Sequence, residues 1–167
     1  MHITRLSLTN FRNYGRLELD LPVGPVLIHG NNAQGKTNLL EAIYYLATTK
    51  SPHADLDQQM INWVAMQADD PVIVGRLVAQ VATAQGQKSV EIRLIYERGA
   101  GSQNGRGSFR REALVDKRKV RLMDLLGHVR VVLFLPEDVQ LITGAPRLRR
   151  RYLDITLCQV DSFYCRA

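Results

Sequence analysis

The sequence predicts an α/β fold, and three observations support that prediction. Apolar and polar residues alternate over parts of 5–21, 72–96 and 109–115, as they do in half-buried strands. A glycine-rich loop at 30–37 follows a short apolar run. Directly after the loop, apolar residues recur at helical spacing. Strands together with a helix that starts at a glycine-rich loop are typical of a helix packed on a sheet.

The N-terminal segment is expected to form a β-hairpin. Apolar positions alternate with polar ones on both sides of a polar, glycine-containing turn at 10–15, namely at Leu6, Leu8, Leu17, Leu19 and Leu21. After a second turn at 22–25, the run Val26–His29 has the composition of a short strand that is covered on both faces. We therefore expect a buried strand to enter the glycine-rich loop.

The loop itself has the pattern G-x-x-x-x-G-K-T of a phosphate-binding P-loop. Its residues are Gly30, Asn31, Asn32, Ala33, Gln34, Gly35, Lys36 and Thr37. Glycines let the backbone curve around an anion so that several N–H groups point inward. Lys36 can reach the β- and γ-phosphates of a nucleotide, and the Thr37 hydroxyl can bind Mg²⁺. The pattern predicts an ATP site with Mg²⁺ as its metal ion.

The helix after the loop carries an apolar stripe of Leu39, Leu40, Ile43, Leu46 and Ala47, with Asn38, Glu41 and Thr48 off the stripe. Strands are expected at 72–81, 90–96 and 109–115, and a second buried strand at 129–135. Short helices are expected at 58–66, 120–126 and after Pro136, and a last helix from Arg147 to near Phe163. The Gly- and Ser-rich segment 99–108 is expected to be a mobile hairpin tip.

Length and charge limit the possible classes. The chain has 167 residues, which suits one domain, 1–167, and its net charge of +6 suits a polyanionic partner such as DNA without requiring one. The N-terminus lacks the features of a signal peptide and no segment resembles a membrane span, which favours a cytoplasmic protein without a membrane partner. The spacing of Cys158 and Cys165 favours free thiols.

A hydrolytic P-loop protein also needs a strand that ends in an acid. The only similar stretch is 131–138, where Pro136 separates the apolar run from Glu137 and Asp138. No Ser-Gly-Gly signature occurs. No catalytic residue is therefore assigned, and whether the chain is an enzyme stays open. Either the protein binds nucleotide without turnover, or the chain is the N-terminal part of a longer protein.

Four blocks together resemble the RecF family of bacterial DNA replication and repair proteins. They are Asn10–Tyr14, the P-loop with its helix start at 30–43, the Pro-Glu-Asp segment at 134–146, and the Arg-Arg-Arg-Tyr-Leu-Asp run at 149–154. The resemblance implies the N-terminal lobe of an ABC-type ATPase head, with a mixed sheet around the P-loop helix and an antiparallel β subdomain. In that family the coiled-coil lobe, the signature motif and the acid-bearing strand lie further along the chain.

The resemblance also implies a function. RecF-like proteins are weak DNA-dependent ATPases that bind DNA, dimerise with ATP, and help to load RecA at gapped DNA together with RecO and RecR in recombinational repair and the SOS response. A chain that lacks the acid and the signature is expected to bind ATP with negligible hydrolysis. The alternative from another class is a self-contained P-loop kinase or nucleotidyltransferase, for which 99–108 with Arg110 and Arg111 is the only candidate lid.

Several residues outside the P-loop are candidates. In related heads the residues matching Arg12 and Asn13 touch the nucleotide, although a solvated turn would also explain them. Four arginines could contact DNA phosphates or a partner subunit, or simply form a solvated helix face: Arg147, Arg149, Arg150 and Arg151. Helical spacing puts Arg147 and Arg151 on one face and Arg149 on another. Glu137, Asp138 and Gln140 match the position of a metal-contacting glutamine loop, and the sequence does not decide among them.

Overall fold

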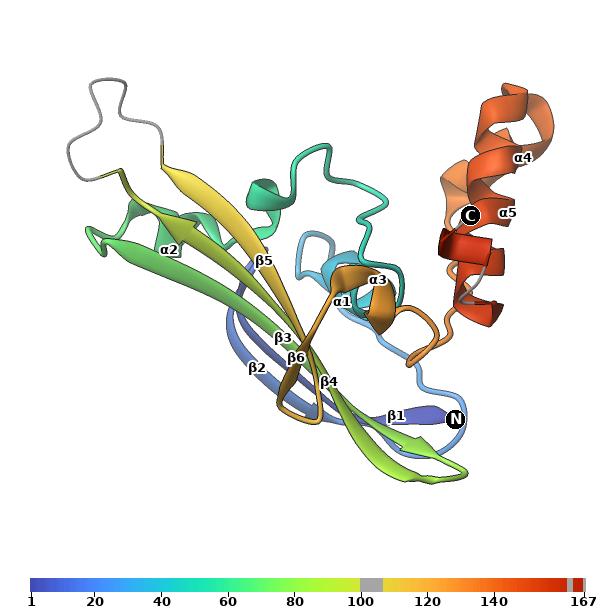
Figure 1. Ribbon diagram of the computed structural model, residues 1–167. Helices are drawn as coiled ribbons and strands as arrows, with labels where there is room; N and C mark the ends of the chain where they lie inside the picture. Colours follow the sequence, from blue (N-terminus) through green and yellow to red (C-terminus); the bar gives the residue numbers. More distant parts are fainter. Residues whose placement is uncertain (100–106, 162–163, 167) are drawn as a thin grey trace.

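The computed structural model describes residues 1–99, 107–161 and 164–166 of the chain. The expected mobile tip at 99–108 thus lies mostly outside the described residues. The fold consists of a twisted sheet, a central helix packed on it, and a helical arm beside them (Figure 1). The α/β class with an antiparallel sheet is confirmed.

One six-stranded antiparallel sheet forms the largest part of the protein, in the order β2-β1-β3-β4-β5-β6. Its strands are β1 (His2–Phe11), β2 (Tyr14–Asp20), β3 (Val72–Thr83), β4 (Gly86–Glu97), β5 (Ser108–Val115) and β6 (Arg118–Val120). The expected hairpin and the strands at 72–81, 90–96 and 109–115 are confirmed. The short strand β6 was not expected. Asp116 and Lys117 form its two-residue turn with positive φ values of 48° and 66°, as primed hairpin turns require.

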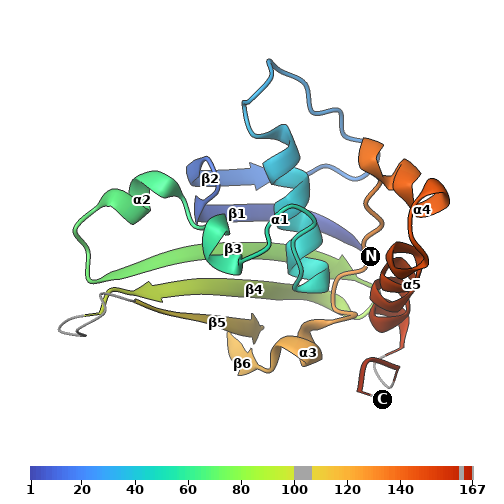
Figure 2. The same ribbon diagram turned by 90° about the horizontal axis from the view of Figure 1, so that it is seen from above.

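Helix α1 (Lys36–Thr48) lies across one face of the sheet (Figure 2). Its buried side chains pack on the alternating apolar positions of the central strands, among them Leu6, Leu8, Phe11, Leu77, Ile92 and Leu94. Smaller elements complete this layer: η1 (Asp57–Met60), α2 (Trp63–Gln67) and α3 (Leu122–Leu125). The core therefore fixes the position of α1, and with it the start of α1 at the P-loop.

On the opposite face of the sheet, charged side chains of neighbouring strands form ion pairs. Arg76 contacts both carboxylate oxygens of Glu91 at 2.8 and 2.9 Å, and Arg93 adds a contact of 2.6 Å. Burial favours the neutral form of Glu91, but the hydrogen bonds from Arg76 and Arg93 outweigh burial and hold the pKa of Glu91 below its usual range.

Two of the expected strands are wrong. Residues 25–30 and 130–135 form no strand. Leu27, Val132 and Phe134 point outward, with 86%, 80% and 81% of each exposed, whereas Leu133 and Leu135 are partly buried and Val131 packs against the core. A strand is stable only when a neighbour pairs with its backbone N–H and C=O groups. No strand among the described residues runs beside either segment. The local composition predicted strands covered on both faces, but the described residues provide neither the pairing strands nor the full cover.

The arm begins after residue 135 with η2 (Pro136–Val139) and α4 (Gln140–Thr143), followed by α5 (Pro146–Val160) and η3 (Tyr164–Arg166). Figure 1 shows it standing to one side of the sheet. The expected helix from Arg147 is confirmed, although it ends at Val160, and Phe163 is not among the described residues. No helix among the described residues has both the length and the apolar character needed to cross a bilayer.

Candidate nucleotide-binding site

The P-loop forms a shallow hollow in front of α1, lined by residues 32–38. Gly35 is the N-cap residue of α1 with φ of 97°, in the left-handed region that favours glycine. No side chain caps the helix and no acidic residue stands in its first turn. The first N–H groups of α1 and its positive dipole end therefore remain available to an anion.

Lys36 and Thr37 stand at the start of α1, where the P-loop pattern predicts them to act. The Lys36 ammonium donates to the carbonyl oxygens of Gly30 at 2.8 Å and Asn31 at 2.6 Å, so the side chain folds back along the loop. A bound nucleotide would offer phosphate oxygens to the same ammonium group. The loop presents N–H donors, one cation and one hydroxyl, a donor set that fits a phosphate whose Mg²⁺ ion is held mainly by phosphate and water oxygens.

Asn13 lies directly against the P-loop, as the sequence interpretation expected of the turn at 12–13. Its amide nitrogen donates to the carbonyl of Gln34 at 3.2 Å, and its amide oxygen accepts from Asn38 at 2.8 Å. A Cβ atom on Gly35 would come within 2.4 Å of the Asn13 amide nitrogen. The next residue, Tyr14, donates its hydroxyl to the Gly35 carbonyl at 3.1 Å. The turn between β1 and β2 thus braces the loop from one side.

Arg12 points away from the hollow, to Glu41 on α1. The guanidinium contacts the two carboxylate oxygens of Glu41 at 2.8 and 2.6 Å. Its remaining nitrogen donates to the carbonyl of Gln59 at 3.1 Å. A direct contact of Arg12 with phosphate stays a prediction, and it would require the guanidinium to leave these partners.

Glu41 is a residue whose role the sequence did not reveal. The sequence placed it off the apolar stripe and gave no sign of burial, yet only 1% of it is exposed. The Ser51 hydroxyl also donates to it at 2.5 Å. The only sequence feature that could have indicated the burial of Glu41 is Arg12 in the turn at 10–15, because a buried carboxylate needs a positively charged partner.

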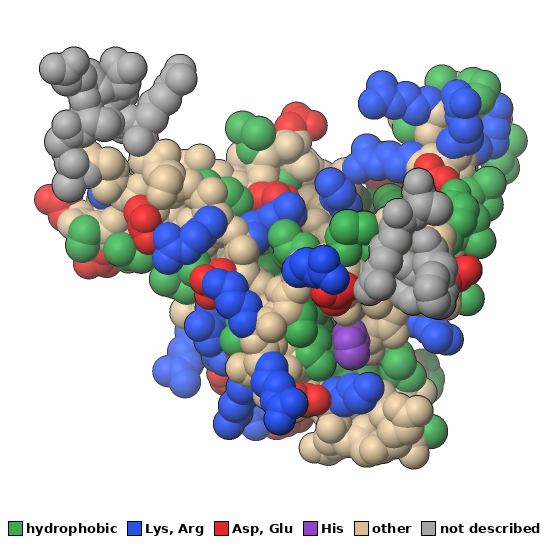
Figure 3. Space-filling model, in the orientation of Figure 1, with side chains coloured by type: hydrophobic (Ala, Val, Ile, Leu, Met, Phe, Trp, Pro, Cys, Tyr) green, Lys and Arg blue, Asp and Glu red, His purple; other side chains and the backbone are tan. Residues whose placement is uncertain are grey.

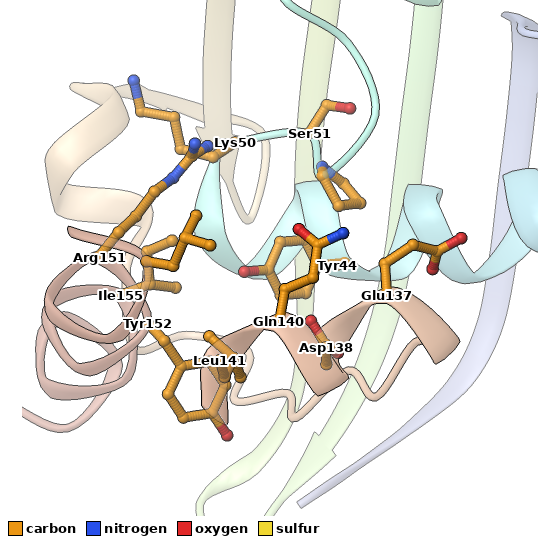
Figure 4. A pocket seen from close by; sticks show the side chains of 12 residues that line it. Tyr44, Lys50, Ser51, Glu137, Asp138, Gln140, Leu141, Arg151, Tyr152 and Ile155 are labelled. Carbon is orange, nitrogen blue, oxygen red and sulfur yellow. The ribbon is translucent and has the colours of Figure 1, made fainter. Parts of the chain in front are cut away.

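Glu137, Asp138 and Gln140 line a different cavity, of about 210 Å³, between the end of α1, η2 and α5 (Figure 4). Asp138 accepts a hydrogen bond from the backbone N–H of Leu135 at 2.7 Å, which caps η2. None of these three residues lines the hollow in front of α1. Which of the three occupies the glutamine-loop position stays open.

The four arginines of α5 separate into two kinds. Arg149 donates to the carbonyls of Leu141, Ile142 and Gly144 at 3.2, 3.4 and 3.1 Å, and so closes the C-terminal end of α4. Arg147, Arg150 and Arg151 start the same helix, and Arg151 also lines the cavity beside Tyr44. Figure 3 shows basic side chains gathered over the outer end of this arm, where the sequence has arginines and no lysine.

The arginines of the alternative lid are engaged elsewhere. Arg111 pairs with Asp57 at 2.6 Å and donates to the Thr49 carbonyl at 3.2 Å, and Arg110 pairs with Glu97. These contacts tie both side chains to the sheet and its adjoining loops, although residues 100–106 lie outside the described part. The kinase or nucleotidyltransferase interpretation gains no support from them.

Comparison with known proteins gives a consistent result. A family model described as AAA domain matches residues 5–137. The DNA replication and repair proteins RecF of Roseiflexus castenholzii and Chloroflexus aggregans are 45% and 43% identical to 99% of this chain, and the chain spans 42% of the length of each. RecF of Streptococcus uberis is 40% identical over 98% of the chain.

Two solved structures of the recombination mediator protein RecF are also similar. The structure of RecF with ATP superposes with a TM-score of 0.74 at 29% identity, over 97% of this chain and 39% of that one. The structure of RecF with ATPrS superposes with a TM-score of 0.69 at 28% identity, over 98% of this chain and 40% of that one. The chain is thus similar over nearly its whole length to about two-fifths of these proteins.

Proposed function

The chain belongs to the AAA-domain family, whose model matches residues 5–137, and on that premise we propose that it is the ATP-binding N-terminal part of a RecF-like DNA replication and repair protein. The open N-terminus of α1 behind the P-loop is the observation that carries the proposal. Lys36 and the backbone of 30–37 hold the phosphates, Asn13 braces the loop, and Thr37 supplies one ligand to Mg²⁺.

In this proposal the chain binds ATP with negligible hydrolysis. The P-loop arrangement can hold phosphates, whereas Glu137 and Asp138 line the other cavity and supply no acid to the hollow. One domain spans 1–167. In the whole protein, ATP would bring two such heads together, and the dimer would act in the cytoplasm with RecO and RecR to load RecA at gapped DNA during recombinational repair and the SOS response.

ATP binding is tested by calorimetry on the chain and on Lys36→Ala. Loss of a charge-assisted contact of about 1.5–3 kcal/mol should weaken binding about ten- to a hundredfold. Lys88→Ala is the matched control, because it removes a lysine on β4 and leaves the P-loop intact. Equal affinity of folded Lys36→Ala and wild-type protein would refute the site, and robust turnover by the chain would refute the absence of hydrolysis.

DNA binding in this proposal is directed at phosphates and independent of sequence. Arg147, Arg150 and Arg151 are the candidate contacts, whereas Arg149 is engaged in closing α4. Each phosphate contact should add about −0.9 to the slope of log K against log salt on duplex DNA. Titrations at several salt concentrations with two unrelated duplexes test this, and a strong sequence preference or an affinity indifferent to salt would contradict it.

A further inference from the structure

We infer that Glu41 is a positioning residue for the nucleotide site: through Arg12 it holds the turn between β1 and β2 so that Asn13 braces the P-loop. This inference rests on the proposed ATP site and adds to it a residue outside the P-loop pattern. Glu41 lies within α1 and does not line the hollow, so its effect on a nucleotide has to be indirect.

The first step is the buried carboxylate itself. Both of its oxygens are occupied by Arg12, and Ser51 contributes a third hydrogen bond. Ser51 in turn accepts hydrogen bonds from the backbone N–H groups of His53 and Ala54 at 3.0 and 2.8 Å. Because the Glu41 carboxylate is buried and fully bonded, a shift of the partly exposed Arg12 guanidinium would leave a buried charge without its partner, and this favours one geometry of the pair.

The second step is the backbone of Arg12. Its φ of 51° lies in the left-handed region, which a non-glycine residue adopts only when its surroundings impose it. The N–H of Arg12 donates to the Met60 carbonyl at 2.7 Å, and Asn62 donates to the Arg12 carbonyl at 2.7 Å. These two bonds and the Glu41 pair fix Arg12 from both its backbone and its side chain.

The third step leads from Arg12 to the loop. Asn13 follows directly in the turn, so the position of Arg12 limits where the Asn13 side chain can reach. Its amide bridges Gln34 and Asn38 and fills the space that a side chain on Gly35 would need. Moving the turn away from α1 would withdraw this amide from the loop and let the loop relax from its phosphate-binding shape.

The sheet offers a matched control for this network. Glu91 is also a buried glutamate held by an arginine through both oxygens, but it lies on the face of the sheet opposite α1. Loss of either glutamate should lower stability. Only loss of Glu41 should change the P-loop.

The experiment measures ATP affinity by calorimetry, corrected for the folded fraction, in Glu41→Gln, Asn13→Ala, the double variant and Glu91→Gln. We expect Glu41→Gln and Asn13→Ala each to raise Kd about tenfold, the order of one lost hydrogen bond, and Glu91→Gln to change Kd by no more than about twofold. Since Glu41 acts through Asn13, the double variant should bind no more weakly than Asn13→Ala alone.

Three results would overturn the inference: unchanged affinity in Glu41→Gln, equal losses in Glu41→Gln and Glu91→Gln, or additive losses in the double variant. If Glu41→Gln does not fold, Ser51→Ala removes one hydrogen bond of the same network and takes its place in the cycle. A failure of Lys36→Ala to weaken binding would refute the ATP site itself, whereas a loss in Lys36→Ala with none in Glu41→Gln would refute only the positioning role.

Discussion

The antiparallel sheet and the two apolar segments at 25–30 and 130–135 differ in where their backbone and side chains find partners. Every strand of the sheet pairs with a neighbour, and one face is covered by α1. Residues 25–30 and 130–135 also have apolar sequences but join no strand of the sheet, and several of their side chains are exposed, among them Leu27, Val132 and Phe134. This difference shows that the apolar composition of a segment indicates a tendency to be buried. Whether the segment is buried depends on the partners that the rest of the fold provides.

Hydrogen exchange should show the largest contrast between the two regions. Amides in the middle of β3 and β4 should open only with global unfolding, which costs about 5–15 kcal/mol in typical domains, whereas those at 26–28 and 132–134 should exchange with almost no protection. Exchange followed by mass spectrometry measures both in one sample. Strong protection at 26–28 would show that this segment has a partner and would end the contrast.

A pair of identical substitutions sharpens the comparison at the level of single side chains. Phe11 is fully buried beneath α1, and Phe134 is 81% exposed. Phe11→Ala should cost about 3–5 kcal/mol in the free energy of unfolding because it removes a core side chain and leaves a cavity. Phe134→Ala should stay within about 0.5 kcal/mol. Urea unfolding of both variants gives the two values, and a similar cost for both would contradict the assignment of Phe134 to an uncovered surface.

The arm allows a smaller comparison of the same kind between neighbouring arginines. Arg149→Ala removes the donor that closes α4 and should lower the stability of the arm by about 1 kcal/mol, since several carbonyls lose their partner. Arg150→Ala should leave stability unchanged and, if α5 meets DNA, weaken binding with a shallower salt slope. Limited proteolysis and DNA titration separate the two effects. If both variants behaved alike in both assays, the distinction between a structural Arg149 and a DNA-contacting Arg150 would be refuted.

The smallest expected effect concerns pH and the ion pairs of the sheet. The pKa of Glu91 is lowered in the folded protein, so its pairing stabilises the fold above its ordinary pKa of 4.5, and this contribution disappears as pH falls through the lowered value. The difference in unfolding free energy between wild type and Glu91→Gln should therefore shrink on acidification from pH 6. The partly exposed arginines keep the effect modest. A difference that is independent of pH would contradict the role of the carboxylate charge.

Local sequence patterns predicted most of the sheet and the P-loop helix because these depend on near neighbours. The alternation around Leu6 and Leu17 and the stripe from Leu39 to Ala47 needed no distant partner to be interpreted. The strands expected at 26–29 and 129–135 failed for the opposite reason, since pairing is a property of the whole fold. Glu41 was missed because its partners Arg12 and Ser51 come from separate segments, and no spacing rule joins them.

The two outer strands of the sheet have a consequence for how copies of the chain can meet. β2 ends the sheet on one side with Arg16, Glu18 and Asp20 along its length, and β6 ends the other side after only three residues, Arg118–Val120. Charged or very short edge strands resist pairing with a strand from another molecule. Folded copies of the chain should therefore not associate by lengthening the sheet, and any contact between them has to use another surface.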